Sequence, residues 1–380
     1  MHIYIGTFLI AFATLTLEIT LSRFLSVSTW YHLAFFAIST AMLGMTAGAT
    51  TTYIKKDWIE RRKLSDVIAL GCLGFAAVLP IVLVLLCLIP IKVERSLMPI
   101  LSLMIITGLC TLPFYFSGFA LSTVLTKSPL PIATLYAVDL IGAALGCLFV
   151  LGGLEIFTAP TLILICALIG VVAAYAFAYG SKSFRLRPWL HIFFVIITGL
   201  VLVNATTRYG IHQMAVKGNV QSIKDVMFEK WNSFSRVVVY QGSEDAPTYW
   251  GPSPTRPQGE KIFQYPMTID GEAFTTVRKF STTRDIEALK YDVTNIAYYL
   301  RPTGGACIIG MGGGRDVQSA LLFGHESVVA IDVNPVFINL QKKEFREFAG
   351  LGNNNRVKLV NDEARSYLTH STASPPCKCP

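Results

Sequence analysis

The stretch CIIGMGGGRDVQSALLFGHESVVAIDVNP, residues 307–335, decides how the rest of the chain is interpreted. Its first three apolar residues predict a short buried strand, and four glycines between positions 310 and 314 end that strand before a helical run over 317–323. A second apolar run, 327–331, ends at Asp332. Strand, glycine turn, helix, strand and acid, in this order, are typical of units that bind a nucleotide or nucleoside.

The glycines and the acid have separate roles in this hypothesis of a Rossmann-like unit. Gly310, Gly312 and Gly314 let the backbone approach a ligand without a Cβ clash, and the start of the following helix offers free N–H groups. Asp332, at the tip of the second strand, can accept hydrogen bonds from both ribose hydroxyls. The alternative is a structural turn in which Asp332 only caps the next helix, where an Asn-Pro pair is a typical start.

The composition of the whole chain indicates a membrane protein. Of its 380 residues 53% are hydrophobic and only 15% are charged, which is too apolar for an ordinary soluble domain. The apolar residues are concentrated before about position 205, so we place the main domain boundary there. Basic loops beside membrane helices explain the net charge of +8, and we expect no nucleic-acid partner. The cysteine spacing predicts neither a disulfide framework nor a metal site.

The membrane domain, residues 1–205, contains seven apolar runs that are long enough to span a bilayer as helices. A cleavable signal peptide is not expected, because the first run lacks a basic start. The runs are 3–21, 33–54, 66–89, 97–125, 132–153, 158–180 and 188–204.

Ionisable residues inside such runs are candidates for function because they are costly in a bilayer. Glu18 and Arg23 lie near one helical face and could pair with each other. Asp139 could partner Arg23 or His32, or line a polar cavity. The small residues over 142–146 that follow it predict close helix packing. We interpret His32, beside Trp and Tyr, as an interfacial residue.

The basic loops predict the orientation of the membrane domain. Lys and Arg cluster over 55–63 and 182–187, after the second and sixth runs, which places both loops and the N-terminus in the cytoplasm. Seven spans would then leave the carboxyl half outside. The predicted binding of a cytosolic nucleoside favours a carboxyl half on the cytoplasmic side instead. We expect a multi-pass cell-membrane protein with its soluble domain in the cytoplasm, against the count of basic loops.

The soluble half divides into two expected parts. Residues 206–283 are a connector and a small antiparallel β-domain, with strands at 234–240 and 261–269 around a Pro- and Gly-rich loop over 242–260. Asp270 and Gly271 form a turn. Residues 284–370 begin with a helix over 284–300 and continue as a partial α/β Rossmann-like domain, and 371–380 form an unstructured tail.

This order of motifs resembles the spermidine synthase family, in its membrane-attached branch. The resembling residues, over about 230–368, are the Ile-Asp-Gly turn, the T-x-R-D segment at 282–285, the helix start at Tyr291, the glycine loop, Asp332, and Asp362 after the strand VKLV. The resemblance implies a transferase in polyamine synthesis. Its co-substrate would be S-adenosylmethionine or decarboxylated S-adenosylmethionine, with no tightly bound cofactor.

The resemblance also implies roles for single residues. Gly310, Gly312 and Gly314 would cradle the methionine-derived part of the donor, and Asp332 would bind its ribose. Asp362 would accept from the adenine amino group, or would only cap the helix 363–368. The resemblance also leaves a homodimer open. The amine or polyamine acceptor would be bound by two residues. These acceptor-binding residues are Tyr291 and Asp292.

The chain departs from the family at several positions. Gly313 replaces an aspartate that binds the donor amine. Arg315 could pair with the carboxylate of intact S-adenosylmethionine, or with Asp316 or solvent. The fourth strand and the catalytic aspartate after it are absent, so we interpret the chain as truncated and assign no catalytic residue. The alternative function is a transport or sensor protein that binds a nucleoside or polyamine, supported by Glu18, His32 and Asp139.

Overall fold

The computed structural model describes residues 1–29, 35–89, 97–179, 187–207 and 209–370. The chain divides into two compact units. The helical unit consists of Met1–Ile223 and Trp231–Arg236, and the sheet unit consists of Lys224–Lys230 and Val237–Pro380. The residues just after the last membrane helix therefore group with the helices.

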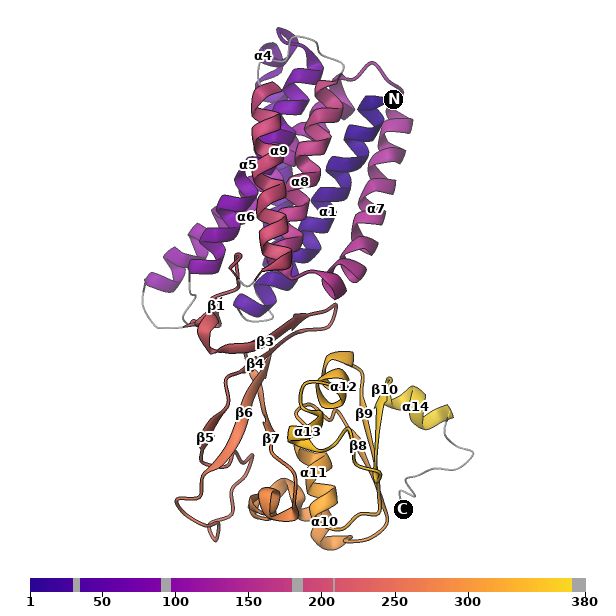
Figure 1. The fold of residues 1–380 in the computed structure, drawn as a ribbon. Coiled ribbons are helices and arrows are strands. Elements are labelled where there is room, and N and C mark those ends of the chain that lie inside the picture. The colour runs from indigo at the N-terminus through magenta and orange to yellow at the C-terminus, as the bar shows by residue number, and fades with distance from the viewer. Residues whose placement is uncertain (30–34, 90–96, 180–186, 208, 371–380) are drawn as a thin grey trace. The chain divides into compact units, whose positions relative to one another are not determined.

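All seven apolar runs form helices, and one further short helix joins two of them (Figure 1). Six of the seven are long and apolar enough to cross a membrane, which agrees with a multi-pass membrane protein. The exception, α3, is rich in threonine. The helices are α1 (His2–Ser28), α3 (Phe36–Ile54), α4 (Lys56–Glu60), α5 (Leu64–Leu88), α6 (Met98–Lys127), α7 (Ile132–Ile156), α8 (Ala159–Ala178) and α9 (Arg187–Thr206).

Glycines let pairs of these helices approach closely. A Cβ atom added to Gly142 of α7 would lie 2.5 Å from the carbonyl oxygen of Phe8, and one added to Gly146 would lie 2.5 Å from that of Phe12. The Thr16 hydroxyl donates to the Gly146 carbonyl at 3.2 Å. These contacts confirm the predicted close packing of the segment 142–146, which is made against α1.

The same kind of contact shows that α3 runs beside α6 in the same direction. A Cβ at Gly44 would lie 2.5 Å from the Thr111 oxygen, and one at Gly48 would lie 2.3 Å from the Tyr115 oxygen. Four residues along α3 thus correspond to four residues along α6. α3 therefore lies parallel to α6, although α3 itself is not apolar enough to be counted among the six candidate membrane spans.

The two ends of the helical unit differ. The N-terminus and α4 lie at one end, as Figure 1 shows. At the other end, where α1 finishes, the Lys217 N–H donates to the Ser28 carbonyl at 2.8 Å. The short strands β1 (Ala215–Val216) and β2 (Asn219–Val220) pair there with each other. The chain therefore leaves the bundle at the end opposite Met1.

The intramembrane ionisable residues differ from the predictions. Within the described residues no ion pair joins Glu18 to Arg23, so that prediction was wrong. Arg23 donates instead to the Ser26 hydroxyl at 3.1 Å and to the Phe234 carbonyl at 2.7 Å, because it lies in the last turns of α1 beside the returning chain. Asp139 lies on α7 without an ion pair to Arg23, and His32 lies outside the described residues.

The sheet unit begins with an antiparallel sheet in the order β3-β4-β6-β5, with β7 paired to β6. The predicted turn is confirmed, since Asp270 and Gly271 have φ values of 52° and 71° between β6 and β7. The segment 242–260 was predicted to be only a loop, but it contains β5, which pairs with β6. The elements are η1 (Ile223–Asp225), β3 (Val226–Trp231), β4 (Arg236–Tyr240), β5 (Ser243–Asp245), β6 (Ile262–Ile269) and β7 (Ala273–Arg278).

The single helix predicted over 284–300 is broken into η2 (Thr283–Tyr291), η3 (Val293–Asn295) and α10 (Ile296–Leu300). The break lies at Asp292, whose backbone is extended with φ −103° and ψ 128°. Its carboxylate accepts hydrogen bonds from the backbone of a distant loop and from the Thr294 N–H. Apolar spacing alone could not reveal this, because the competing partners are tertiary.

The carboxyl-terminal part is a parallel three-stranded sheet in the order β10-β9-β8, with helices between the strands. Its elements are β8 (Gly305–Ile309), α11 (Arg315–Leu322), β9 (Ser327–Asp332), α12 (Pro335–Lys342), α13 (Arg346–Ala349), β10 (Val357–Asn361) and α14 (Ala364–His370). One hydrophobic core joins this sheet to the antiparallel one, with Val239, Met267 and Val277 packed in the same cluster as Ala330 and Phe337. The tail 371–380 lies outside the described residues.

Candidate functional site

The glycine turn lies at the carboxyl end of β8. Gly310, Gly312 and Gly314 have φ values of 76°, 49° and 90°, a region that side chains other than glycine rarely adopt. The Gly310 N–H donates to the Ile331 carbonyl at 2.8 Å, which ties the turn to the end of β9. The predicted glycines are therefore required by the backbone itself, whether or not a ligand is present.

Asp332 is the acid that holds this turn. Only 6% of its surface is exposed, and its two carboxylate oxygens accept from the Gly312 N–H at 3.1 Å and from the Asn334 N–H at 2.9 Å. Burial raises the pKa of Asp332 above its usual value, and the backbone hydrogen bonds only partly offset this. Asn334 caps α12 by accepting from the Val336 N–H at 3.2 Å. The alternative that Asp332 caps the next helix was therefore wrong, because Asn334 is the cap, but Asp332 does have a structural role in holding the turn.

Gly313 lies in the turn between β8 and α11. A Cβ added to Gly313 would lie 2.4 Å from the Thr276 carbonyl oxygen of β7. The Gln341 side chain donates to the Gly313 carbonyl at 3.0 Å from the other side. Because backbone fills this space, no side chain fits at position 313.

Asp362 lies beside Asp332 at the carboxyl edge of the sheet. Its N–H donates to the Asp332 carbonyl at 3.2 Å, and its side chain is exposed. The residue that caps α14 is Glu363, whose carboxylate accepts from the N–H groups of Arg365 and Ser366 at 3.0 and 2.9 Å. Among the described residues, the Asp362 carboxylate accepts only from the Glu363 N–H, at 2.8 Å. The alternative of Asp362 as the helix cap was therefore wrong, and its carboxylate faces solvent.

A hollow of about 610 Å³ lies beside these residues. Ile309 lines it and is 64% exposed, although it ends a strand of the parallel sheet. A Cβ built on the neighbouring Gly310 would have no atom within 4 Å. The turn is thus packed at Gly313 and open at Gly310. The other lining residues are Glu363, Ala364, Arg365, Leu368 and Thr369.

Asp292, the predicted acceptor-binding residue, is 3% exposed and fully engaged. It accepts from the N–H groups of Trp250 and Gly251 at 2.9 and 3.1 Å, and from the Arg315 guanidinium at 2.8 Å. Burial alone would raise its pKa, but the backbone hydrogen bonds and the charge of Arg315 outweigh burial and lower it. The neighbouring Tyr291 accepts from the Ser253 N–H through its carbonyl, at 2.7 Å.

Arg315 joins this network to the start of α11. The prediction that it pairs with Asp316 is confirmed at 2.9 Å, and its contact with Asp292 adds a second ion pair. Both Arg315 and Asp316 line a second hollow of about 510 Å³ along β8, together with Tyr298. Ile309, which directly precedes the glycine turn, lines both hollows.

Arg278, at the end of β7, was not identified from the sequence. It is 1% exposed, and its Nη2 donates to the Thr248 carbonyl, whereas Nε and Nη1 have no hydrogen-bond partner among the described residues. Burial, with the nearby charge of Arg315, lowers the pKa of Arg278 to about 10. The sequence carries no local signal for it, because its burial depends on the distant loop that contains Thr248.

Within the described residues no group of three or more His, Cys, Asp or Glu side chains could hold a metal ion. Comparisons of the chain with protein-family models, with curated proteins and with solved structures gave no match. The arguments for function therefore rest on the residues at the carboxyl edge of the parallel sheet.

Proposed function

We propose that the sheet unit binds an adenosine-containing sulfonium, S-adenosylmethionine or its decarboxylated form, as a partial Rossmann-like domain. The chain would then be a membrane-bound, spermidine synthase-like transferase that acts on an amine or polyamine acceptor. The observation that carries this proposal is the grouping of Gly310, Asp332 and Asp362 at one edge of a parallel sheet, where open α/β sheets bind their ligands.

In this proposal the adenine base of the donor lies in the hollow beside Ile309. Ile309 and Leu368 offer exposed apolar surface, 64% and 42% exposed, against which a purine ring can lie. The exposed carboxylate of Asp362 is next to α14, which forms part of the wall. An exocyclic amino group of adenine would donate to it. Asp332 would then accept hydrogen bonds from the ribose hydroxyls. These would either replace the hydrogen bond from the Gly312 N–H or be made in addition to it.

The methionine-derived end of the donor meets a closed surface at Gly313. Thr276 fills the space that an aspartate would need there, and Asp292 and Asp316 already occupy Arg315. Neither the amine nor the carboxylate of a donor has a dedicated partner at these positions. This favours binding of the adenosine part over recognition of the tail, and no described residue is assigned as a catalytic base.

The proposal is tested by titrating the detergent-purified chain with S-adenosylmethionine, decarboxylated S-adenosylmethionine and methylthioadenosine. Because the adenosine part supplies the contacts, the three ligands should bind within about tenfold of one another. A strong preference for the decarboxylated donor would support aminopropyl transfer despite Gly313. No binding of any of the three would refute the proposal.

A second function is favoured by one feature of the helical unit. The basic α4 segment and the N-terminus lie at one end, and the chain leaves the bundle at the other, after the seven long helices that the structure describes. If the basic end is cytoplasmic, the sheet unit is outside, away from any cytosolic donor. The chain would then be a sensor or transport protein whose sheet unit binds a nucleoside or polyamine without turnover.

The side of the membrane separates the two functions. Single cysteines introduced by Lys56→Cys and Glu326→Cys can be labelled in intact cells with an impermeant maleimide, with the parent chain as background. If α3 crosses the membrane together with the six candidate spans, only one of the two positions is labelled. Labelling at position 56 would place the sheet unit in the cytoplasm and support the transferase. Labelling at position 326 would support the sensor or transport protein.

A further inference from the structure

The helical unit contains a hollow of about 270 Å³ near the basic end of α3, α5 and α6. It is slightly smaller than the ~300–1,000 Å³ typical of sites for drug-sized ligands, so it holds part of a larger molecule. Most of its surface is apolar, and five of its side chains are aromatic or aliphatic. The lining residues are Thr51, Lys55, Trp58, Leu70, Gly71, Tyr115, Phe116 and Phe119.

Two glycines of α5 shape the wall of this hollow. A Cβ added to Gly74 would lie 2.5 Å from the Phe116 ring, and one added to Gly71 would lie 3.2 Å from the Phe119 ring. The missing side chains let both rings of α6 lie against the α5 backbone. Leu70 stands beside them and is 37% exposed. The floor of the hollow is therefore aromatic and rigid, with an aliphatic side chain at its edge.

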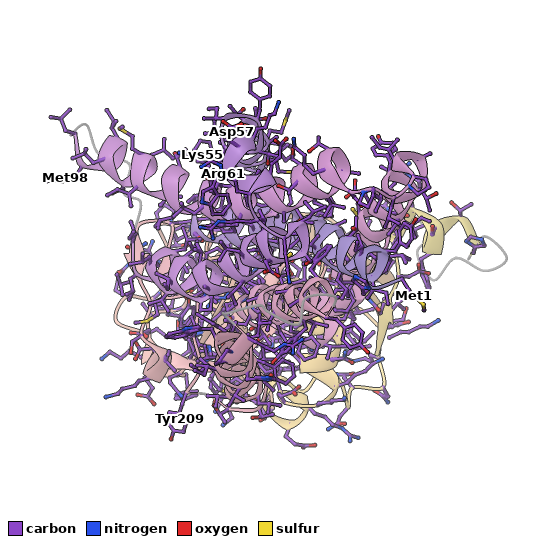
Figure 2. All side chains as sticks on the ribbon, turned by 90° about the horizontal axis from the view of Figure 1, so that it is seen from above. Met1, Lys55, Asp57, Arg61, Met98 and Tyr209 are labelled. Carbon is purple, nitrogen blue, oxygen red and sulfur yellow. The ribbon has the colours of Figure 1, made fainter. Side chains whose placement is uncertain are left out.

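The rim of the hollow is basic and is built by α4 and the end of α3. Lys55 lies at the rim and makes no ion pair within the described residues, and Figure 2 labels it near Arg61. Trp58, also at the rim, is covered by the Arg62 guanidinium 4.3 Å from its ring centre. Glu60, which could neutralise a lysine here, is paired with Lys127 at 2.8 Å. Asp57 also lies in this segment, but within the described residues it forms no ion pair with Lys55, so the Lys55 ammonium group can pair with an anionic group.

We propose that this hollow binds one anionic glycerophospholipid. Its phosphate would pair with Lys55, the glycerol region would lie beside Trp58, and the start of one acyl chain would cover Leu70 and Phe116. The position favours a lipid over a soluble anion, because α5 and α6, which supply most of the lining, are long and apolar enough to cross a membrane, and the lining residue Leu70 is 37% exposed. Tryptophan and lysine at this level are typical of the membrane interface.

The test uses the full-length chain in detergent, with native mass spectrometry to count bound lipids and a thermal melt as a second readout. Phosphatidylglycerol should bind at one site and raise the melting temperature. Phosphatidylcholine and glycerol 3-phosphate should do neither, because the first carries no net charge and the second has no acyl chain. Equal binding of phosphatidylcholine, or an equal effect of glycerol 3-phosphate, would overturn the proposal.

Two pairs of variants locate the site. Lys55→Gln should weaken phosphatidylglycerol binding about fivefold, whereas the adjacent Lys56→Gln, which does not line the hollow, should leave it unchanged. Leu70→Trp should fill the hollow and abolish binding, and Ile81→Trp on the same helix is its control, since Ile81 is 62% exposed and lies outside the lining. Equal effects within either pair would show that the lipid binds elsewhere or only adheres to the basic end.

Discussion

The Gly312 N–H donates to a carboxylate oxygen of Asp332 at 3.1 Å, across the ends of two neighbouring parallel strands. The acid that would bind a ribose is therefore also the acid that fixes the shape of the glycine turn. A variant of Asp332 would change both stability and binding. Tests of ligand binding need residues at the same edge that do not hold the turn.

Asp332→Asn is expected to lower the free energy of unfolding of the sheet unit by about 1–3 kcal/mol, because an amide group directed at the Gly312 N–H leaves a buried donor unpaired. Thermal or denaturant unfolding of the purified chain measures this. Asp362→Asn, at an exposed position, is the matched control and should leave stability within about 0.5 kcal/mol of the parent. Equal stabilities of the two variants would contradict the role of Asp332 in the turn.

Asp362→Ala should weaken binding of S-adenosylmethionine about tenfold, the loss expected when one hydrogen bond to a charged group is removed. Isothermal titration measures the affinity. Glu326→Ala is the control, because Glu326 is an exposed acid that immediately precedes β9 and lies at the opposite edge of the same sheet. If both variants bind S-adenosylmethionine as tightly as the parent does, the adenine base does not lie beside Asp362.

Ile309→Ser should weaken binding by about 1–2 kcal/mol with little change in melting temperature, since the side chain is already 64% exposed in the free protein and becomes buried only against a ligand. Val333→Ser, at an exposed position after β9 that does not line the hollow, should bind normally. If the Ile309 variant has a lower melting temperature and an unchanged affinity, Ile309 stabilises the fold and does not contact the ligand.

Arg278→Met should leave the free energy of unfolding unchanged or raise it by about 1–3 kcal/mol, because it removes a buried guanidinium with two unpaired nitrogens. The lowered pKa of about 10 has the same sign: the charged form is disfavoured in the folded state, so parent stability should rise with pH between about 10 and 12.5. Denaturant unfolding at pH 7 gives the difference. A clear destabilisation by methionine would mean that Arg278 has partners that stabilise it.

Acid should weaken the contact between the 250–251 loop and η3. The pKa of Asp292 is lowered in the folded state, so its carboxylate contributes stability that is present above the unfolded value of about 3.8–3.9 and is lost as pH falls through the folded value below it. Tryptophan fluorescence during acid titration should follow this change through Trp250. Asp292→Asn should lose most of that dependence, and an unchanged acid transition in the variant would assign it to other carboxylates.

The sequence predicted the elements whose signals are local. The glycines at 310–314, Asp332 and the helix start at Asn334 follow one another within 25 residues, and each is required by backbone geometry at its own position. The membrane helices were predicted for the same reason, by length and apolar content. Asp362 was assigned to the same site as Asp332 only through the family resemblance, and no local signal in the sequence indicated it.

The features that the sequence did not reveal depend on contacts between distant segments. The helix break at Asp292 is caused by Trp250 and Gly251, about 40 residues earlier, and the closure of Gly313 by Thr276 on a strand that was not predicted. Arg23 lies five residues after Glu18, and helical spacing suggested a pair. Arg23 binds the Phe234 carbonyl instead, more than 200 residues along the chain.

The most direct test of the account is isothermal titration of S-adenosylmethionine into the full-length chain, the Asp362→Ala variant and the Glu326→Ala control. We predict saturable binding at one site in the parent and the control, and about tenfold weaker binding in the Asp362 variant. The same affinity in all three chains, or no binding to the parent, would contradict the assignment of a nucleoside site to the carboxyl edge of β8, β9 and β10.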